Sequence, residues 1–151
     1  MVAKVQFIDD DEVAVFREKG YTTFESMKQP QMAVEKNFDV DIKSIAYNKD
    51  WMAVVTAKDG KVDDQTILLL NRNGREKLKQ KISYEYSDMQ IYGDEIIFVG
   101  NRSCHILRSN GNEKFHYEFE KEIDAVFPTS GRKEYTLIDS ATIQKISLDS
   151  K

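Results

Sequence analysis

The stretch Asp94–Glu120, DEIIFVGNRSCHILRSNGNEKFHYEFE, contains the pattern that decides the fold. Two apolar runs lead to an Asn110-Gly111 turn, after which apolar and polar side chains alternate. Asn-Gly between strand-like segments is a strong hairpin signal, because both residues tolerate positive φ in a type I′ turn. Alternation with a period of two indicates a strand with one exposed face. The stretch therefore predicts antiparallel strands over 95–100, 104–107 and 113–120.

A polar turn followed by an apolar run occurs four times along the chain. The four runs begin at residues 12, 51, 95 and 134, so they are 39, 44 and 39 residues apart. A polar insertion at 58–65 accounts for the longer middle spacing. The Asn-Gly turn also recurs, because NGREKL at 73–78 resembles NGNEKF at 110–115. A four-stranded unit of about 40 residues that repeats is typical of a β-propeller blade.

In this blade pattern the sequence resembles β-propeller proteins of the WD-repeat and quinoprotein-like type. Its phrases ILLLNRNGREKLKQKI at 67–82 and DEIIFVGNRSCHILRSNG at 94–111 are similar to propeller-like domains of unknown function in membrane-anchored bacterial proteins. The resemblance implies an all-β propeller fold and no catalytic residue. It also implies an extracytoplasmic location if the chain is a fragment of an anchored protein, and a cytoplasmic location otherwise.

We expect one propeller or half-propeller domain over residues 1–151, with four blades and about fifteen strands. The blades are predicted at about 3–40, 41–86, 87–121 and 122–151. The fourth blade has sequence for three strands, at 124–127, 134–139 and 141–148. Two arrangements are open: a small four-bladed ring, or half of a larger ring with exposed blade faces. We favour the half-ring, which two copies would complete and in which a partner strand would fill the fourth blade.

Composition limits the function classes. The chain has 26 acidic and 22 basic residues, and its net charge of -4 argues against sequence-independent nucleic-acid binding, which depends on neutralising phosphates. The longest wholly apolar run, WMAVV at 51–55, has five residues, far fewer than the ~20 that a membrane helix needs, so no membrane insertion is expected within this segment. The single cysteine, Cys104, excludes an internal disulfide and a cysteine-rich zinc site.

Few residues suggest chemistry. His105 follows Cys104 on a strand, so their side chains point to opposite faces and do not readily share a metal ion. His116 belongs to the polar face of its strand. We therefore predict no catalytic, cofactor or metal site, and we expect Cys104 to be a small buried apolar residue. The acidic segment 9–12 is interpreted as a solvated turn before a strand.

Two sets of residues are candidates for an interaction surface. Asp59, Asp63 and Asp64 lie in the inserted loop, and inserted loops often carry binding residues. Tyr117 and Phe119 belong to an aromatic set that also contains Tyr84, Tyr86 and Phe115. Packing between neighbouring sheets explains this set, and a partner interface is the alternative.

The expected function is non-catalytic protein interaction or assembly, with ring completion by self-association into a homo-oligomer. The alternatives are a small-ligand carrier built as one antiparallel β-barrel, and an enzyme on a propeller scaffold. No cofactor is expected for the leading hypothesis.

Overall fold

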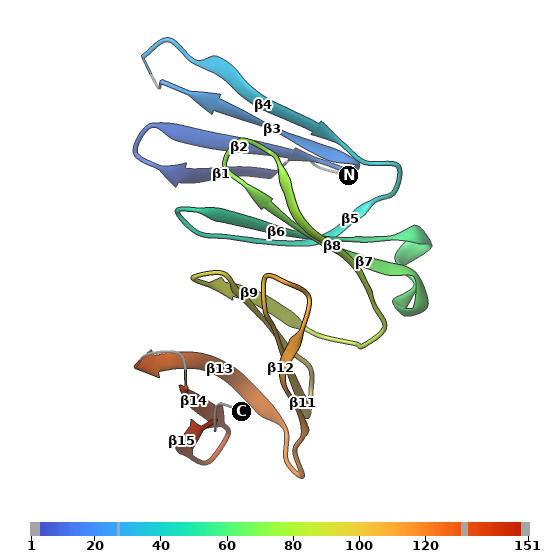
Figure 1. Cartoon of the computed structure of the whole chain (residues 1–151), viewed down its shortest axis with the longest axis vertical. Helices are drawn as coiled ribbons and strands as arrows, with labels where there is room; N and C mark the ends of the chain where they lie inside the picture. Colours follow the sequence, from blue (N-terminus) through green and yellow to red (C-terminus); the bar gives the residue numbers. More distant parts are fainter. Residues whose placement is uncertain (1–3, 27, 131–132, 149–151) are drawn as a thin grey trace. The chain divides into compact units, whose positions relative to one another are not determined.

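The computed structural model describes residues 4–26, 28–130 and 133–148. In these residues fifteen strands form four antiparallel sheets, three with four strands and one with three (Figure 1). The all-β fold of propeller-like sheets is therefore confirmed. The ends of the predicted domain, at 1–3 and 149–151, lie outside the described residues, as do residues 27 and 131–132.

Each sheet takes its strands in chain order. The first sheet consists of β1 (Lys4–Asp9), β2 (Glu12–Arg17), β3 (Gly20–Glu25) and β4 (Gln31–Asn37). The second consists of β5 (Ile42–Tyr47), β6 (Trp51–Ala57), β7 (Gln65–Asn71) and β8 (Glu76–Ile82). The third consists of β9 (Asp88–Tyr92), β10 (Glu95–Val99), β11 (Ser103–Leu107) and β12 (Glu113–Glu118). The fourth consists of β13 (Ile123–Ser130), β14 (Glu134–Asp139) and β15 (Ile143–Ser147).

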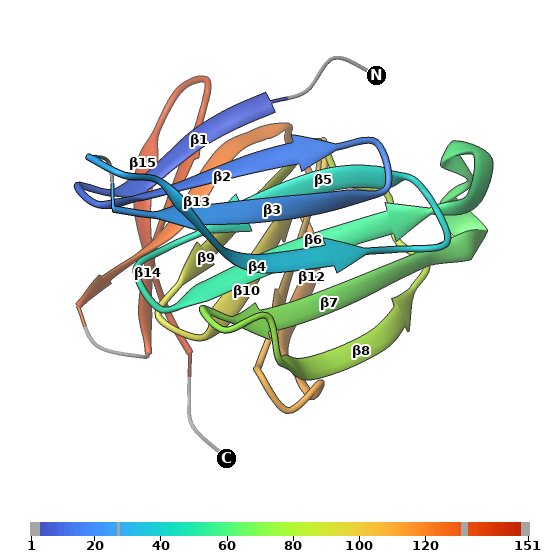
Figure 2. The same ribbon diagram turned by 90° about the horizontal axis from the view of Figure 1, so that it is seen from above.

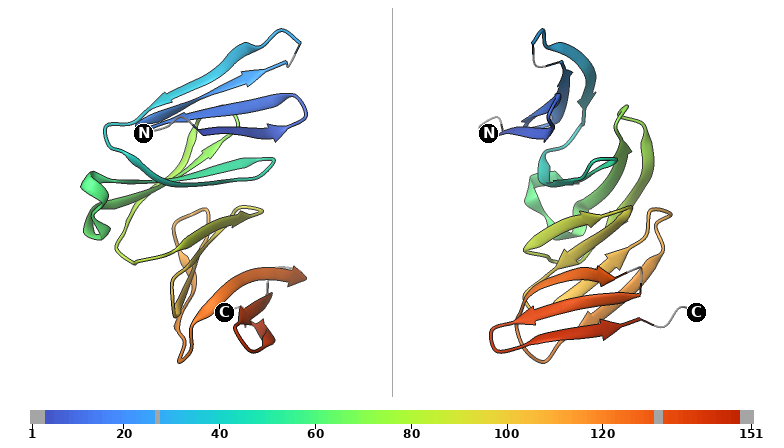
Figure 3. Two further views of the ribbon diagram at one scale, coloured as in Figure 1. Left: turned by 180° about the vertical axis from the view of Figure 1, so that it is seen from behind. Right: turned by 90° about the vertical axis from the view of Figure 1, so that its left-hand side faces the viewer.

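The polar insertion of the second sheet forms two short 3-10 helices, η1 (Lys58–Gly60) and η2 (Val62–Asp64). They lie between β6 and β7 and project from one end of the sheet (Figure 2). The apolar runs predicted to begin at residues 12, 51, 95 and 134 are β2, β6, β10 and β14. Each of them is the second strand of its sheet (Figure 3).

The chain forms two compact units that divide between Tyr84 and Glu85, and each unit has a core between its two sheets. The core of the first unit contains Ala14, Phe16, Tyr21, Met52, Val54, Leu68 and Leu70. The core of the second contains Ile97, Val99, Cys104, Ile106, Ile123, Val126, Tyr135 and Leu137. Because side chains alternate between the two faces of a strand, every second residue of a central strand, such as Met52 and Val54 or Ile97 and Val99, belongs to the core between the two sheets of its unit.

The Asn-Gly hairpins differ from the predicted type I′ turns. Gly74 and Gly111 have φ of +80° and +90°, but Asn73 and Asn110 do not have the positive φ that a type I′ turn requires. The described non-glycine residues with positive φ are Ser26 and Asp59. The amide of Gly111 donates a hydrogen bond to the Arg108 carbonyl. Each turn is therefore a three-residue loop with glycine in the left-handed region, and the pairing shifts by one residue next to it. Only one positive φ is needed in such a loop, and glycine supplies it.

The sheet topology excludes the single closed barrel that was one alternative. The described strands divide into four separate sheets, whereas a barrel of this kind needs one continuous sheet. No helix in the described part of the chain is long and apolar enough to span a bilayer.

Candidate functional site

A buried polar cluster joins the two sheets of the second unit. Glu95 begins β10, and its carboxylate lies 2.8 Å from Nζ of Lys114 on β12. The hydroxyl of Tyr135 on β14 donates to Glu95 at 2.7 Å and accepts from Lys114 Nζ at 2.8 Å. Burial and the bond to Glu95 both raise the pKa of Tyr135. The alternating pattern placed Lys114 on a solvated face, but its side chain is only 8% exposed because its ammonium group bridges to this cluster.

The first unit has a related cluster at the equivalent strand. Glu12 begins β2, and Arg72, which follows β7, lies 2.7 Å from the carboxylates of both Glu12 and Asp9. Glu12 is 6% exposed. The interpretation of 9–12 as a solvated turn is therefore wrong for Glu12, which is held between two sheets by the guanidinium group. The hydrogen bond from the backbone amide of Asp11 lowers the pKa of Asp9, and the hydrogen bond from Arg72 is the second cause of this shift.

The acidic residues predicted to form an interaction loop lie apart from these clusters. Asp59 belongs to η1, and Asp63 and Asp64 belong to η2. Asp59 and Asp63 are exposed, and Asp64 is half-buried. Among the described residues, the three do not form a group with the geometry of a metal site.

The aromatic residues near β12 have two different environments. Phe115 and Phe119 pack against the core of the second unit. Tyr117 is 53% exposed, and its ring centroid lies 4.9 Å from that of Phe119 and 6.3 Å from that of Phe115. Tyr86 packs edge-on against Phe98, with the ring centroids 5.0 Å apart. The set therefore supports the core, and Tyr117 is the member of β12 that presents a large surface to solvent.

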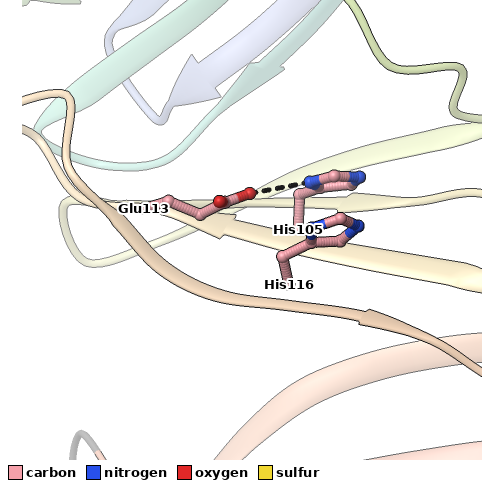
Figure 4. Close-up of side chains that lie close together, drawn as sticks. All are labelled: His105, Glu113 and His116. Atoms are coloured by element: carbon pink, nitrogen blue, oxygen red, sulfur yellow. Dashed lines mark hydrogen bonds and ion pairs between the residues drawn. The ribbon is translucent and has the colours of Figure 1, made fainter.

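Strands β11 and β12 bring His105, Glu113 and His116 together (Figure 4). The two histidines are directly opposite each other in the strand register, and their rings stack with centroids 4.1 Å apart and planes at 16°. Nδ1 of His105 lies 2.8 Å from a carboxylate oxygen of Glu113. One potential ligand atom from each residue lies within 4.8 Å of the other two. His105 is 7% exposed, whereas Glu113 and His116 are exposed.

The order of residues along the chain did not predict this group, because the chain neighbour of His105 is Cys104, whose side chain points to the opposite face. The relevant neighbour is across the hairpin. His105 precedes Asn110 by five residues, and His116 follows Gly111 by five, so a hairpin centred on the turn pairs them. Cys104 is in the opposite, core-facing position, as expected, and burial raises the pKa of its thiol to about 12.

The first sheet exposes a row of apolar side chains on the face that is turned away from its core. In the strand register Phe7 is opposite Val13, Val13 is opposite Phe24, and Phe24 is opposite Met32. This outer row of the first sheet therefore crosses all four strands. Its two ends are the most exposed, because Phe7 is 65% and Met32 is 61% accessible to solvent.

The fourth sheet has a shorter row on the corresponding face. Ala125 is opposite Ile138, and Ile138 is opposite Ile143, which is 75% exposed. We call these three residues the outer row of the fourth sheet. Side chains next to them on the same strands, such as Tyr135 and Leu137, point into the core.

Comparisons with known proteins agree with the architecture. Sqt1 of Saccharomyces cerevisiae is similar with a TM-score of 0.60 and 12% identity, over 98% of this chain and 44% of Sqt1. BamB from Moraxella catarrhalis is similar with a TM-score of 0.56 and 12% identity, over 95% of this chain and 42% of BamB. Both are β-propeller proteins, and the chain spans less than half of the length of each.

None of the curated proteins matches the sequence significantly. One family model, described as a family of unknown function (DUF5711), matches residues 1–148. The chain therefore belongs to the DUF5711 family.

Proposed function

We propose that this chain is a non-catalytic β-propeller module for protein assembly, and that a second copy of the chain completes its ring of blades. The outer row of the first sheet is the observation that carries the proposal. A contiguous apolar strip across a whole sheet is uncommon on the surface of a monomeric protein, and it marks an interaction surface. In a propeller, each blade face is covered by the next blade.

The outer row of the fourth sheet has the chemistry to cover the outer row of the first. Both rows are apolar, and both lie on faces turned away from the core of their unit. Two copies related by a twofold axis would each place their first sheet on the fourth sheet of the other. That arrangement makes two identical contacts and leaves no outer row exposed. It uses the same sheet-on-sheet packing that joins the sheets within each unit.

The coverage of the solved propellers supports a chain that contributes about half of a ring, because it spans 44% of Sqt1 and 42% of BamB. The third strand of the fourth sheet, β15, ends the sheet in the described residues. Its edge is available for a further strand, which the partner copy would supply in the proposed assembly.

The oligomeric state tests the proposal. Sedimentation equilibrium of the full chain is expected to give twice the chain mass of 17.5 kDa. Phe7→Arg is expected to give a monomer, because it places a charge at the more exposed end of the outer row, inside the proposed apolar contact. Phe7 is largely exposed, so the substitution leaves the core of the first unit intact.

Tyr92→Arg is the matched control. Tyr92 is also an exposed aromatic residue, at 37%, but it lies on β9, outside both outer rows. Its substitution is expected to leave the mass unchanged. A wild-type chain that stays monomeric at all concentrations, or equal dissociation by both substitutions, would overturn the proposal.

A further inference from the structure

We propose that His105, Glu113 and His116 bind one divalent transition-metal ion, for which Zn²⁺ is the probe. The group has two imidazoles and one carboxylate, which are the nitrogen and oxygen ligands that zinc prefers alongside thiolate. The two adjacent strands hold all three residues, so the site depends on a single hairpin. This inference is independent of the proposed assembly.

The geometry is close to that of a coordination shell. Zinc ligands lie at about 2.0–2.2 Å from the ion, so ligand atoms around one ion are about 3–4 Å apart. The potential ligand atoms here lie within 4.8 Å of one another, and small side-chain rotations would close the remaining gap. The His116 ring must turn out of its parallel arrangement with the His105 ring so that one nitrogen of each ring points at the ion. His116 and Glu113 are exposed and free of core packing constraints, so they are the side chains that would move.

His105 would be the fixed member of the site. It is 7% exposed on the central strand β11, and its Nδ1 already contacts the Glu113 carboxylate. A carboxylate next to a ligating imidazole is favourable, because its negative charge offsets part of the charge of the cation. Cys104 does not take part, because its thiol belongs to the core on the other face of the sheet.

The donor set determines which ions are expected. Imidazole nitrogens favour Zn²⁺, Cu²⁺ and Ni²⁺, whereas Mg²⁺ and Ca²⁺ favour shells made of oxygen ligands. Three protein ligands leave one tetrahedral position open for water or for an external donor. A ligating imidazole must be neutral, so metal binding at this site is coupled to proton release.

Isothermal titration of the tag-free full chain with Zn²⁺ tests this inference. We expect one ion per chain and no comparable heat with Mg²⁺. The sequence has only two histidines, so imidazole NMR signals of both are expected to shift together on addition of Zn²⁺. His116→Ala and Glu113→Gln each remove a proposed ligand, so each is expected to weaken Zn²⁺ binding at least ~100-fold, which is the upper end of the loss caused by mutating an outer-shell partner. Both positions are exposed, and circular dichroism establishes that the variants are folded.

Glu76→Gln is the matched control. Glu76 occupies the same place after its Asn-Gly turn that Glu113 occupies after the other, but no histidine lies across the hairpin from it. Its substitution is expected to leave Zn²⁺ affinity unchanged. The proposal is overturned if Zn²⁺ does not bind, if His116→Ala binds as tightly as wild type, or if Glu76→Gln weakens binding as much as Glu113→Gln.

Discussion

Replacing Lys114 by methionine is expected to destabilise the second unit by about 3 kcal/mol. The substitution keeps the length of the side chain and removes its charge, so it leaves the Glu95 carboxylate buried without its cation. Removing one partner of a buried ion pair costs about 3–5 kcal/mol. We take the lower end because Glu95 is 13% exposed and still accepts the hydrogen bond from Tyr135.

Urea unfolding followed by circular dichroism measures this effect. With a slope of about 2 kcal/mol per M, the midpoint is expected to fall by about 1.5 M. Adding Glu95→Gln to Lys114→Met is expected to recover part of the loss, because the pair is then neutral on both sides. Tyr135→Phe alone is expected to cost about 1.5–3 kcal/mol through the lost bond to a charged group. A loss below about 1 kcal/mol for Lys114→Met would show that the cluster is effectively solvated and would refute this reasoning.

Three further predictions concern the packing of the units. Arg72→Met is expected to lower the free energy of unfolding by about 1–3 kcal/mol in urea, because Glu12 stays buried after the partly exposed guanidinium group is lost. An unchanged free energy of unfolding would contradict the role of Arg72 between the two sheets. Gly74→Ala is expected to lower the thermal midpoint more than Gly93→Ala, because both have positive φ but only the Cβ at Gly74 would meet a side chain, at 2.6 Å; equal effects would show that the backbone strain alone matters. Burial raises the pKa of Cys104 from 9.0 to about 12, so the unfolded chain loses this proton first and the free energy of unfolding falls as the pH rises above 9, by about 2 kcal/mol at pH 10.5. Cys104→Ala is expected to flatten that decline, which urea unfolding between pH 8.5 and 10.5 measures; an unchanged decline would assign it to other groups.

Much of the fold follows from local patterns. The second strand of each sheet is an apolar run bounded by polar turns, and β2, β6 and β14 begin where the spacing of these runs predicted. Apolar and polar residues also alternate over 76–82, and β8 has the matching burial, with Leu78 half-buried and Lys77 and Lys79 exposed, because successive side chains of a strand point to opposite faces. The three strands of the fourth sheet were also expected from the sequence.

The contacts between elements were harder to predict. Glu12 and Glu95 are polar residues at turns, and nothing in their local sequence distinguishes a solvated carboxylate from one held between two sheets. Their partners, Arg72 and Tyr135, are 60 and 40 residues away in the chain. The outer rows likewise depend on which face of each terminal sheet is turned away from the core, and strand alternation alone does not determine that.

The histidine pair was predictable in principle but was missed. Strand register places His105 opposite His116 once the hairpin is centred on Asn110 and Gly111. The side-chain rotamers that bring Glu113 within 2.8 Å of His105 have no signal in the sequence. The sequence therefore contained the pairing of His105 with His116, whereas the position of the Glu113 carboxylate was visible only in the structure.

The central claim is that the outer rows of two copies meet head to tail, and mixing two variants tests it most directly. Phe7→Arg damages the first-sheet side of the contact, and Ile143→Arg damages the fourth-sheet side. Each variant alone is expected to sediment as a 17.5 kDa monomer. An equimolar mixture is expected to regain a species of twice that mass, because one of its two contacts joins two unaltered rows. Monomers in the mixture as well as in each variant, beside a wild-type dimer, would contradict head-to-tail assembly, as would a dimer of either variant alone.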